Sequence, residues 1–456
     1  MEVTADGEGV VSQAGAELLR ELAGATGLID AWDAALIGTY KAMPIHFPGS
    51  VLVDLAVAIA DGADSISDLR RLRDHPEVFG PVASTPTAWR VLDRVSAAHL
   101  PLLRQGRATA RARAWAAGAG PDLDSELYLD IDASIVIAHS DKQDAAATWK
   151  KTFGFHPILC FLDRPETVSS GEALSGIVRP GNAGSNTAAD HIEVLDQGLD
   201  SLPGPARPRP GDPDGPHLVV RADAAGATHD FAAHCREVGV GFSFGFAITQ
   251  DVRDAIEELE PAEWWEAIEA EDEIRDGAWV GEVTEMVDLE AWPVGSRVIV
   301  RRERPHPGAA LSLFDFGSGY RHTAFITAPR SAQERLEAGI DALELSHRRH
   351  ARVEDRIRQA KAAGMRNLPC KEAAENHAWL ECVLTAADLV VWSKLICFAD
   401  DPALARCEIE NFRYRILHMA ARITRSGRVV HLRLDKTWAW AKALALGFKR
   451  LRVAFA

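Results

Sequence analysis

Hydrophobic positions recur every three to four residues through the first 120 residues, where Ala, Leu and Arg dominate. This spacing predicts a helical N-terminal domain at 1–120. Within it, Thr85 and Pro86 stand where the cap and the first position of a helix are expected, and the preceding stretch 67–76 also has a helical pattern. Two short helices joined by a turn fit either a helix-turn-helix or a helical hairpin within a bundle.

From Leu127 the pattern changes to that of strands, with short apolar runs bounded by turn residues. Three strands, a helix, a strand, a helix and a last strand are expected in this order. Such an order predicts a mixed α/β core, whose first part we place at 121–250. The elements are expected at 127–139, 156–163, 172–181, 186–202, 217–226, 228–238 and 241–248.

A different pattern follows at 251–328, which we expect to form a β-rich insertion. Its first part, 251–290, holds sixteen acidic residues, two Arg and three of the Trp residues. Its second part alternates apolar and polar residues, which predicts antiparallel strands at 297–305, 311–317 and 323–329. A long basic helix is then expected at 331–363, within a second part of the core at 329–400. The region 401–456, with twelve Lys and Arg against four acidic residues, is expected to be helical and basic.

Composition narrows the class of protein. The 456 residues are 47% hydrophobic and 25% charged, which excludes wholesale disorder, a collagen and a coiled-coil rod. The formal net charge of −16 does not by itself suggest a nucleic-acid binder, but the positive charge gathers in the C-terminal half. Six Cys without a C-x-x-C pair are expected to be buried free thiols.

The ends and the most apolar stretch predict a cytoplasmic protein. The N-terminus lacks the basic start and the apolar run of a signal peptide. The apolar stretch 378–399 carries Glu381, Asp388 and Lys394, whose burial in lipid would be costly. We therefore expect a buried amphipathic helix there and no membrane contact.

Three carboxylates stand out by their surroundings. Asp132 lies within an apolar strand, Asp223 ends another strand, and Glu354 lies on the basic helix. A carboxylate within an apolar strand is costly unless it is paired or binds a metal. Two Asp at strand ends and one helical Glu would suit Mg²⁺, which prefers oxygen ligands. Taken singly, each has an ordinary alternative: a turn or cap for the Asp residues, and an exposed ion pair with Arg358 for Glu354.

The basic helix adds a second signal. His347, His350, Glu354 and Lys361 are three, four and seven residues apart, so they share one helical face. Seven Lys and Arg lie between residues 346 and 366, against two acidic residues. A face this positive around one acid suits a polyanion better than a protein core.

With these features the chain resembles the DDE transposases of bacterial insertion sequences, and most closely the insertion sequence 1380 family. The resemblance spans about 27–397 and is carried by the segments LYLDIDASIVIAH, FGFHPILCFLD, GIVRPGNAGSN, LVVRADAAG, ARVEDRIRQAK and NLPCKEAAENHAWLECVLTAADLVVW. It implies an α/β fold with an RNase H-like catalytic core and a β-rich insertion between the second Asp and the Glu. The helical domain at 1–120 would then bind the DNA ends.

The same resemblance implies the catalytic and metal-binding triad Asp132, Asp223 and Glu354, with Asp130 as the rival for the first position. Relatives carry a Tyr-x2-Arg-x3-Glu-x6-Lys motif on the Glu helix. Glu354 and Lys361 keep its last spacing, whereas His347 and His350 replace the Tyr and the Arg. Arg349 and Arg352 are alternatives for the Arg role.

The implied activity is cleavage of DNA at the ends of an insertion sequence and transfer of the freed 3′-OH to target DNA. Two Mg²⁺ ions, or Mn²⁺ in their place, would serve as cofactors. The partners would be the terminal inverted repeats, the target DNA and a second copy of the chain in a homodimer. The expected DNA contacts are Lys361, His350, His347, Arg349, Arg352, Arg358 and Trp265, with Trp264, Trp279 and Trp292 as further candidates to stack on a base.

Two other readings share this fold: a stand-alone Mg²⁺-dependent nuclease and a catalytically decayed DNA-binding relative. The acidic part of the insertion also suggests a hypothesis, that it masks the basic C-terminal region when DNA is absent.

Overall fold

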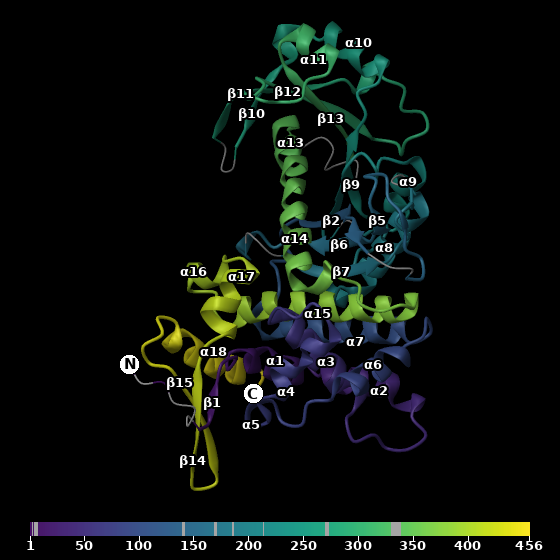
Figure 1. The fold of residues 1–456 in the computed structure, drawn as a ribbon. Coiled ribbons are helices and arrows are strands. Elements are labelled where there is room, and N and C mark those ends of the chain that lie inside the picture. Colours follow the sequence, from purple (N-terminus) through teal and green to yellow (C-terminus); the bar gives the residue numbers. More distant parts are fainter. Residues whose placement is uncertain are drawn as a thin grey trace.

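The computed structural model places a large mixed sheet and one long buried helix at the centre of the chain (Figure 1). In Figure 1, helix α15 (Ala373–Cys397) runs across the middle, with the sheet on one side and the N-terminal helices on the other. The structure describes residues 1, 3, 8–138, 142–167, 171–184, 187–212, 214–269, 273–329 and 339–456.

The sheet has nine strands in the order β10-β11-β12-β13-β9-β8-β2-β6-β7. β2 pairs in parallel with β8, and β8 with β9, whereas all the other neighbours are antiparallel. The strands are β2 (Leu127–Ala133), β6 (Ile158–Leu162), β7 (Glu172–Ile177), β8 (Leu218–Ala222), β9 (Gly241–Phe246), β10 (Trp265–Ile268), β11 (Ile274–Glu282), β12 (Arg297–Glu303) and β13 (Arg321–Ala328). The expected mixed α/β class is thus observed, and the strands of 251–328 continue the central sheet.

Helices cover both faces of this sheet because its inner strands are apolar on both sides. α8 (Ala188–Ser201), α9 (His229–Glu237) and α10 (Gln250–Glu258) pack on one face through a core that includes Leu129 and Ile131. The other face packs on α15 and the N-terminal helices. These are α1 (Ala16–Ala25), α2 (Leu28–Leu36), α3 (Pro48–Ala60), α4 (Arg70–Arg73), α5 (Pro76–Phe79), α6 (Thr85–Asp93) and α7 (Leu100–Ala114).

Buried ion pairs fix α7 and α15 against the edge of the sheet. Arg107 Nη1 lies 2.9 Å from Glu381 Oε2, and Arg111 Nη2 lies 2.7 Å from Asp388 Oδ2. Arg111 Nε also lies 2.9 Å from Glu172 Oε2 on β7. All five side chains are almost completely buried, so each charge depends on its partners. The charges expected to make 378–399 amphipathic are therefore inside, and α15 is buried on nearly every side.

Several predicted boundaries differ from the structure. Strand 127–139 ends at Ala133, and a separate short strand, β3 (Val136–Ile137), follows it. The helix expected to begin after Thr85 includes Thr85, because Ser84 is the residue before the first turn and its hydroxyl lies 3.0 Å from that of Thr87. The segment 67–76 forms only short turns of helix.

The strand expected at 311–317 is wrong. This segment forms α11 (Leu313–Ser318), because the Ser312 hydroxyl and the Asp315 carboxylate cap each other's backbone N–H groups. Gly319 then ends the helix with a left-handed backbone, φ 78°. Local capping thus overrides an apolar run.

The long helix expected at 331–363 is interrupted in the structure. α13 (Ile340–Arg348) passes through a 3-10 turn at 349–351 into α14 (Arg352–Ala360), and a π turn follows at Lys361–Met365. Residues 331–338 lie outside the described part of the chain. Figure 1 shows α13 and α14 in line along one side of the sheet.

The C-terminal region is not purely helical, contrary to expectation. Between the short helices α16 (Pro402–Ala405) and α17 (Ile409–Phe412) and the terminal helix α18 (Ala441–Ala454), strands β14 (Ala421–Ser426) and β15 (Val429–Leu434) form a hairpin. β1 (Val10–Val11) pairs with β14 at the hairpin's inner edge. Across the described ranges, every helix is too short or too polar to cross a membrane.

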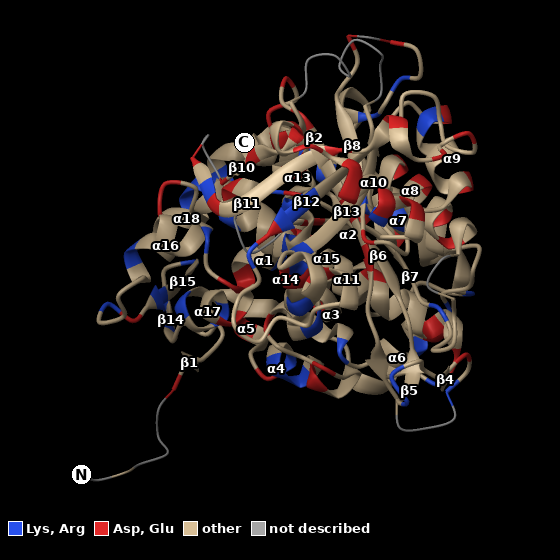
Figure 2. Cartoon of the chain, turned by 90° about the horizontal axis from the view of Figure 1, so that it is seen from above, with Lys and Arg blue, Asp and Glu red and all other residues tan. Residues whose placement is uncertain are grey.

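The masking hypothesis is not supported within one chain. In the parts of 251–290 that the structure describes, the acidic residues form ion pairs with Arg275, Arg297, Arg304 and Arg348, all outside 401–456. In Figure 2 the ribbons of α8, α9 and α10 are also marked red at acidic positions, so acidic residues are spread over the helices that cover the sheet.

Candidate active site around Asp132

Strand β2 carries both candidate first carboxylates, two residues apart and therefore on the same side of the strand. It lies between β6 and β8, where Asp130 pairs with Arg221 and Asp132 with Leu159 in register. Asp132 is the last residue but one of β2, so its side chain is only partly buried, whereas Asp130 is 0% exposed. Asp130 is thus the inner, buried acid of β2, and Asp132 is the outer, partly buried one.

The inner acid, Asp130, is fully committed to neighbouring cations. Arg221 Nε and Nη2 donate to its two carboxylate oxygens at 2.7 and 2.9 Å, and His350 Nδ1 lies 3.0 Å from Oδ1. These partners outweigh the cost of burial and lower the pKa of Asp130 to about 2. The carboxylate is therefore charged and already paired.

The outer acid, Asp132, has no such cation pair. Its Oδ1 accepts a hydrogen bond of 2.7 Å from the N–H of Ala133. Burial, together with the nearby carboxylates of Asp223 and Glu354, raises the pKa of Asp132 to about 6. Asp223 and Glu354 therefore each lie within electrostatic range of Asp132, although more than 80 residues separate each acid from the next along the chain.

Asp223 and Glu354 are both exposed and reach Asp132 from different elements. Asp223 directly follows β8, and its Oδ1 accepts a hydrogen bond of 2.9 Å from the N–H of Ala225. This is the turn geometry expected of an Asp at a strand end that has no catalytic role. Glu354 lies in the first turn of α14. Arg358 does not pair with it; Arg358 Nη2 instead lies 3.0 Å from Asp355 and 2.8 Å from Glu408.

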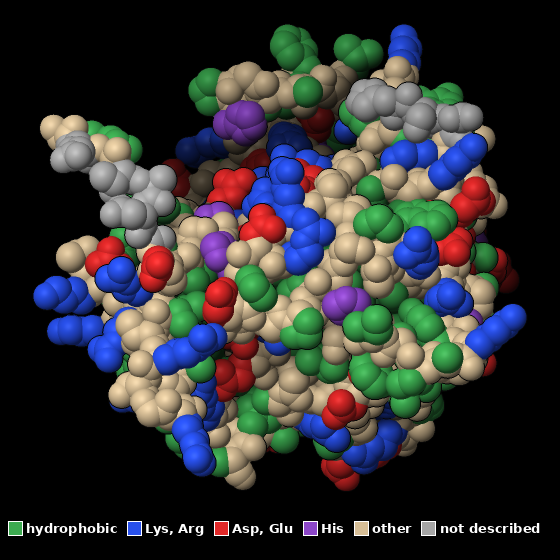
Figure 3. Space-filling model, turned by 60° about the horizontal axis from the view of Figure 1, so that its bottom comes forward, with side chains coloured by type: hydrophobic (Ala, Val, Ile, Leu, Met, Phe, Trp, Pro, Cys, Tyr) green, Lys and Arg blue, Asp and Glu red, His purple; other side chains and the backbone are tan. Residues whose placement is uncertain are grey.

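Positive charge surrounds this group of acids. Lys361 begins the π turn after α14, and its ammonium lies within electrostatic range of Asp132. Partial burial and the charge of Lys150 lower the pKa of Lys361. Figure 3 shows a hollow in the surface in which acidic, basic and His side chains lie close together.

The two His residues of the helix do not lie free at the surface. The His347 ring stacks on Phe325 with 4.4 Å between ring centroids, and its Nδ1 lies 2.9 Å from the Ser243 hydroxyl. Burial, together with the nearby positive groups, lowers the pKa of His347 to about 3, so the ring is neutral at physiological pH. The structure thus turns His347 and His350 toward the sheet, where each ring has a protein partner.

The expected Arg contacts are only partly available. Arg352 Nη1 lies 3.4 Å from Asp163, and Arg358 is engaged by two carboxylates. Arg349 is half-buried in the 3-10 turn. Of the Lys and Arg residues predicted to contact DNA on this helix, Lys361 is the one that lies within electrostatic range of Asp132 in the described residues.

Trp265 lies apart from the acids, on the edge strand β10. Its side chain is 63% exposed and lines an open pocket of about 840 Å³ together with the beginning of α13. Trp264 and Trp279 instead enclose the Arg302 guanidinium, at 4.0 and 5.5 Å from their ring centroids. Trp292 packs against His229 and Phe246. Among the four candidate Trp residues, Trp265 thus offers the most open ring.

The donor set fits a divalent cation that shares its ligands with a substrate. The carboxylates of Asp223 and Glu354 raise the pKa of Asp132, and within the described residues no Lys or Arg forms an ion pair with Asp132. A cation bound at Asp132 would offset this repulsion. Within the described residues, no three His, Cys, Asp or Glu side chains are close enough to enclose a metal ion.

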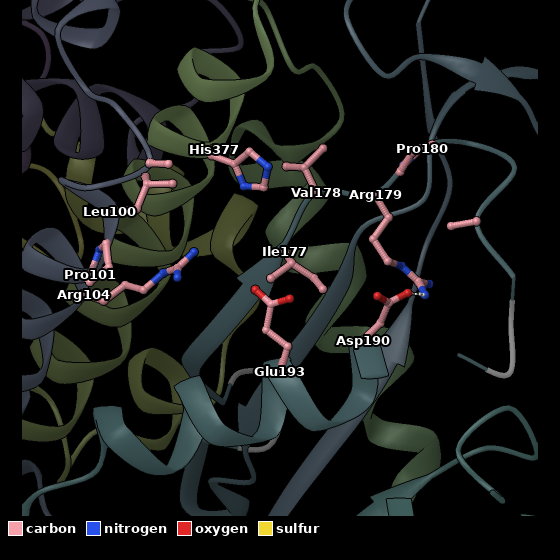
Figure 4. Close-up of a pocket in the computed structure, with 12 residues that line it drawn as sticks. Leu100, Pro101, Arg104, Ile177, Val178, Arg179, Pro180, Asp190, Glu193 and His377 are labelled. Carbon is pink, nitrogen blue, oxygen red and sulfur yellow. Dashed lines mark hydrogen bonds and ion pairs between the residues drawn. The ribbon is translucent and has the colours of Figure 1, made fainter. Parts of the chain in front are cut away.

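A separate pocket of about 420 Å³ lies between α7, the end of β7, α8 and α15 (Figure 4). Its two Arg residues are already paired: Arg104 Nε lies 2.8 Å from Glu381, and Arg179 Nη1 lies 2.8 Å from Asp190. None of the three candidate acids lines it. We therefore do not assign this pocket to the site.

Sequence reasoning missed Arg221 and Asp163, which hold the site together. Arg221 bridges Asp130 and Asp163, and Arg356 of α14 also donates to Asp163. An Arg within the apolar strand at 218–222 was a usable signal, because a buried guanidinium requires acidic partners.

Comparison with known proteins gives one family. Residues 1–455 match the family model described as transposase DDE domain group 1. No curated protein matches the chain. Six chains of solved structures match, among them the cryo-EM structure of a piggyBac transposase synaptic complex with hairpin DNA, at 8% sequence identity, over 87% of this chain and 79% of that chain, with a TM-score of 0.39.

Proposed function

The chain belongs to the transposase DDE domain group 1 family, and from this membership we propose that Asp132, Asp223 and Glu354 are the acids that give the family its name. The protein is a DNA transposase, an enzyme that cleaves DNA strands and transfers them. Its partner is DNA, and enzymes of this family generally use divalent metal ions. The proposal concerns the residues that bind the metal ions and the DNA.

The observation that carries the assignment is the effect of Asp223 and Glu354 on Asp132. Both carboxylates raise the pKa of Asp132, so both lie near it, although they come from a second strand end and from a helix. Asp130 is the weaker candidate because Arg221 already occupies both of its oxygens. We therefore take Asp132 as the first acid and Asp130 as the residue that anchors β2.

In this mechanism the residues of the chain hold the reacting groups in place. Asp132, Asp223 and Glu354 would hold two Mg²⁺ ions, or Mn²⁺ in their place, through their carboxylate oxygens. When bound, the ions would activate the attacking oxygen and stabilise the leaving oxygen of an in-line displacement. Lys361 neutralises a phosphate beside the cut. His350 holds Asp130, and His347 orients the helix on the sheet, through the contacts described above.

The finer classification is also a proposal. The strand order β7-β6-β2-β8-β9, with its three antiparallel strands followed by two parallel ones, supports an RNase H-like core. With it we propose the expected domains: a DNA-end-binding domain at 1–120, core parts at 121–250 and 329–400, an insertion at 251–328 and a basic C-terminal region at 401–456. The matching segments named above favour the insertion sequence 1380 family, and concerted cutting of two element ends favours a homodimer. Trp265, exposed on the insertion, is the candidate to stack on a base, and Arg349 remains a candidate phosphate contact.

The test uses a labelled duplex carrying the DNA that flanks the coding region, with Mg²⁺ present. We expect the full chain to nick this DNA and to join a supplied 3′-OH end to a plasmid. Glu354→Gln should bind the duplex as the wild type does and lose cleavage by a factor of about 10³ or more, a loss typical of an essential catalytic group. The neighbouring exposed Asp355→Asn serves as the matched control and should cleave normally. Unchanged cleavage by Glu354→Gln would refute the assignment, and cleavage without joining would favour a stand-alone nuclease.

A further inference from the structure

The hairpin β14–β15 is a two-stranded ribbon whose sequence lacks acidic residues. Arg422 lies directly opposite Arg433, Thr424 opposite His431 and Ser426 opposite Val429. Gly427 closes the turn with a left-handed φ of 62°. Residues 421–434 contain four Arg and no Asp or Glu. In Figure 1 the hairpin projects away from the helical body.

One side of the ribbon is anchored and the other is free. Opposite residues in an antiparallel ladder point to the same side, so Ala421, Ile423, Leu432 and Leu434 share one side. This side packs on Val11 and Ala14. Arg422, Arg433 and Thr424 therefore point to the opposite side, where both Arg side chains are exposed. The hairpin thus holds its polar side outward in a fixed register.

The positions of the Arg residues on the hairpin lower its stability, and no ion pair within the described residues compensates for this. Like charges directly opposite each other on a sheet destabilise it. Within the described residues, no carboxylate forms an ion pair with Arg422, Arg425, Arg428 or Arg433. Arg422 donates to the backbone carbonyl of Glu8, and Arg433 donates to Thr424. Arg425 and Arg428, at the tip, are exposed. By the same alternation Arg425 lies on the side of Ile423, so the four Arg are spread over both sides of the ribbon and its tip. Exposed positive charge of this kind suits a polyanion outside the chain.

A groove of about 790 Å³ between β15 and α18 extends the positive surface. Its walls include Lys436, Lys442 and Lys449, all exposed. The acidic residues on its far wall are Glu17, Glu21 and Glu77. Glu21 is paired with Arg452 at 2.7 Å, and burial raises the pKa of Glu17 to about 7, so their negative charge is reduced.

We propose that the β14–β15 hairpin is a DNA-binding ribbon, which inserts its Arg-bearing tip into a groove of duplex DNA while the groove beside α18 follows the phosphate backbone. This inference rests on the proposed function, because it takes the enzyme's DNA as the occupant. The major groove of B-DNA admits a two-stranded ribbon, and Arg is the side chain best suited to phosphates and guanine edges. The exposed Val429 and Val430 at the tip add apolar contacts of the kind that thymine methyl groups accept.

The test measures the affinity of the full chain for a fluorescent duplex of mixed sequence, about 30 base pairs long, over a range of salt concentrations. The variant is Arg425→Ala/Arg428→Ala, since neither side chain has a hydrogen bond or ion pair within the described residues that its loss would break. The matched control is Arg207→Ala/Arg209→Ala, which removes the same charge from an exposed loop. Thermal unfolding of both variants checks that each is folded.

We expect the hairpin variant to bind about five-fold or more weakly, with the slope of log K against log salt reduced by about 2, and the control to bind as the wild type does. Equal affinity of the two variants would overturn the proposal. So would an unchanged DNA affinity combined with lost binding to phosphatidylserine vesicles, which would assign the ribbon to a membrane surface. Cleavage by the wild type is measured in parallel. Normal cleavage together with an unchanged DNA affinity of the hairpin variant would overturn the ribbon proposal alone. Absence of cleavage would overturn the proposed function alone.

Discussion

Arg221 grips Asp130 through both carboxylate oxygens, at 2.7 and 2.9 Å, at a point on the sheet where Asp132 lies only two residues away. The two acids on one side of β2 consequently have opposite roles. Asp130 is a charged carboxylate that pairs with Arg221, and its pKa is about 2. Asp132 is a partly buried carboxyl whose pKa is raised to about 6. The predictions below follow from this division and from the contacts around it.

Replacing the inner acid should affect folding before chemistry. Asp130→Asn leaves Arg221 buried beside a neutral amide, and breaking a buried pair in this way typically costs about 3–5 kcal/mol. Urea unfolding of Asp130→Asn and Asp132→Asn compares the two sites. We expect a large loss for the first and a free energy of unfolding close to or above the wild type for the second. The reverse order would contradict the division of roles.

Mg²⁺ should stabilise the folded chain through Asp132. A ligand that binds only the native state adds about 2.7 kcal/mol at one hundred times its Kd. Thermal unfolding with increasing MgCl2 should raise the Tm of the wild type and of Asp355→Asn, and leave the Tm of Asp132→Asn unchanged. An equal rise in all three proteins would place the ions elsewhere.

His347 should make the fold sensitive to acid. Its folded pKa of about 3 lies below the ordinary value of about 6.5, so the unfolded chain binds the proton more readily. Its contribution to stability is full above pH 6.5 and is lost as the pH falls toward 3. His347→Phe keeps a ring against Phe325 and cannot take up the proton. Between pH 7 and 4 this variant should lose about 1–3 kcal/mol less than the wild type in urea unfolding. Parallel curves would show that His347 titrates normally.

The buried network on α15 should be the most sensitive point outside the site. Asp388→Ala strands Arg107 and Arg111 without their shared acid, so we expect a loss of about 3–5 kcal/mol in unfolding free energy. Asp400→Ala removes an exposed acid paired with Arg450 and should unfold as the wild type does. Similar losses of unfolding free energy for both variants would mean that the buried ion pairs contribute no more to stability than an exposed one.

The sheet around the site could be predicted because its strands are locally distinctive. The runs at 127–133, 158–162 and 218–222 are short, apolar and bounded by turn residues, and each is a strand in the structure. The segment 311–317 has a similar apolar run, but Ser312 and Asp315 stand at capping-box spacing, which indicated a helix. The hairpin at 421–434 was also overlooked, although Ser426-Gly427 separates two alternating runs.

The charge network could not be predicted by local rules. The segment of α7 around Arg107 and Arg111 resembles an exposed basic helix, because nothing nearby in the sequence balances its charge. Its partners Glu381 and Asp388 are more than 270 residues away, and only the packing of α15 against α7 brings them together. The same holds for His347, whose low pKa depends on burial and on Arg221 and Arg301 from two distant strands.

The most direct measurement of the central claim is the position of bound Mn²⁺ in crystals of the full chain. Anomalous scattering from Mn²⁺ locates the ion independently of any assay. We expect an anomalous peak within coordination distance, about 2.0–2.4 Å, of a carboxylate oxygen of Asp132 and of one from Asp223 or Glu354. A map whose peaks lie elsewhere, with these three side chains free of metal at saturating Mn²⁺, would contradict it.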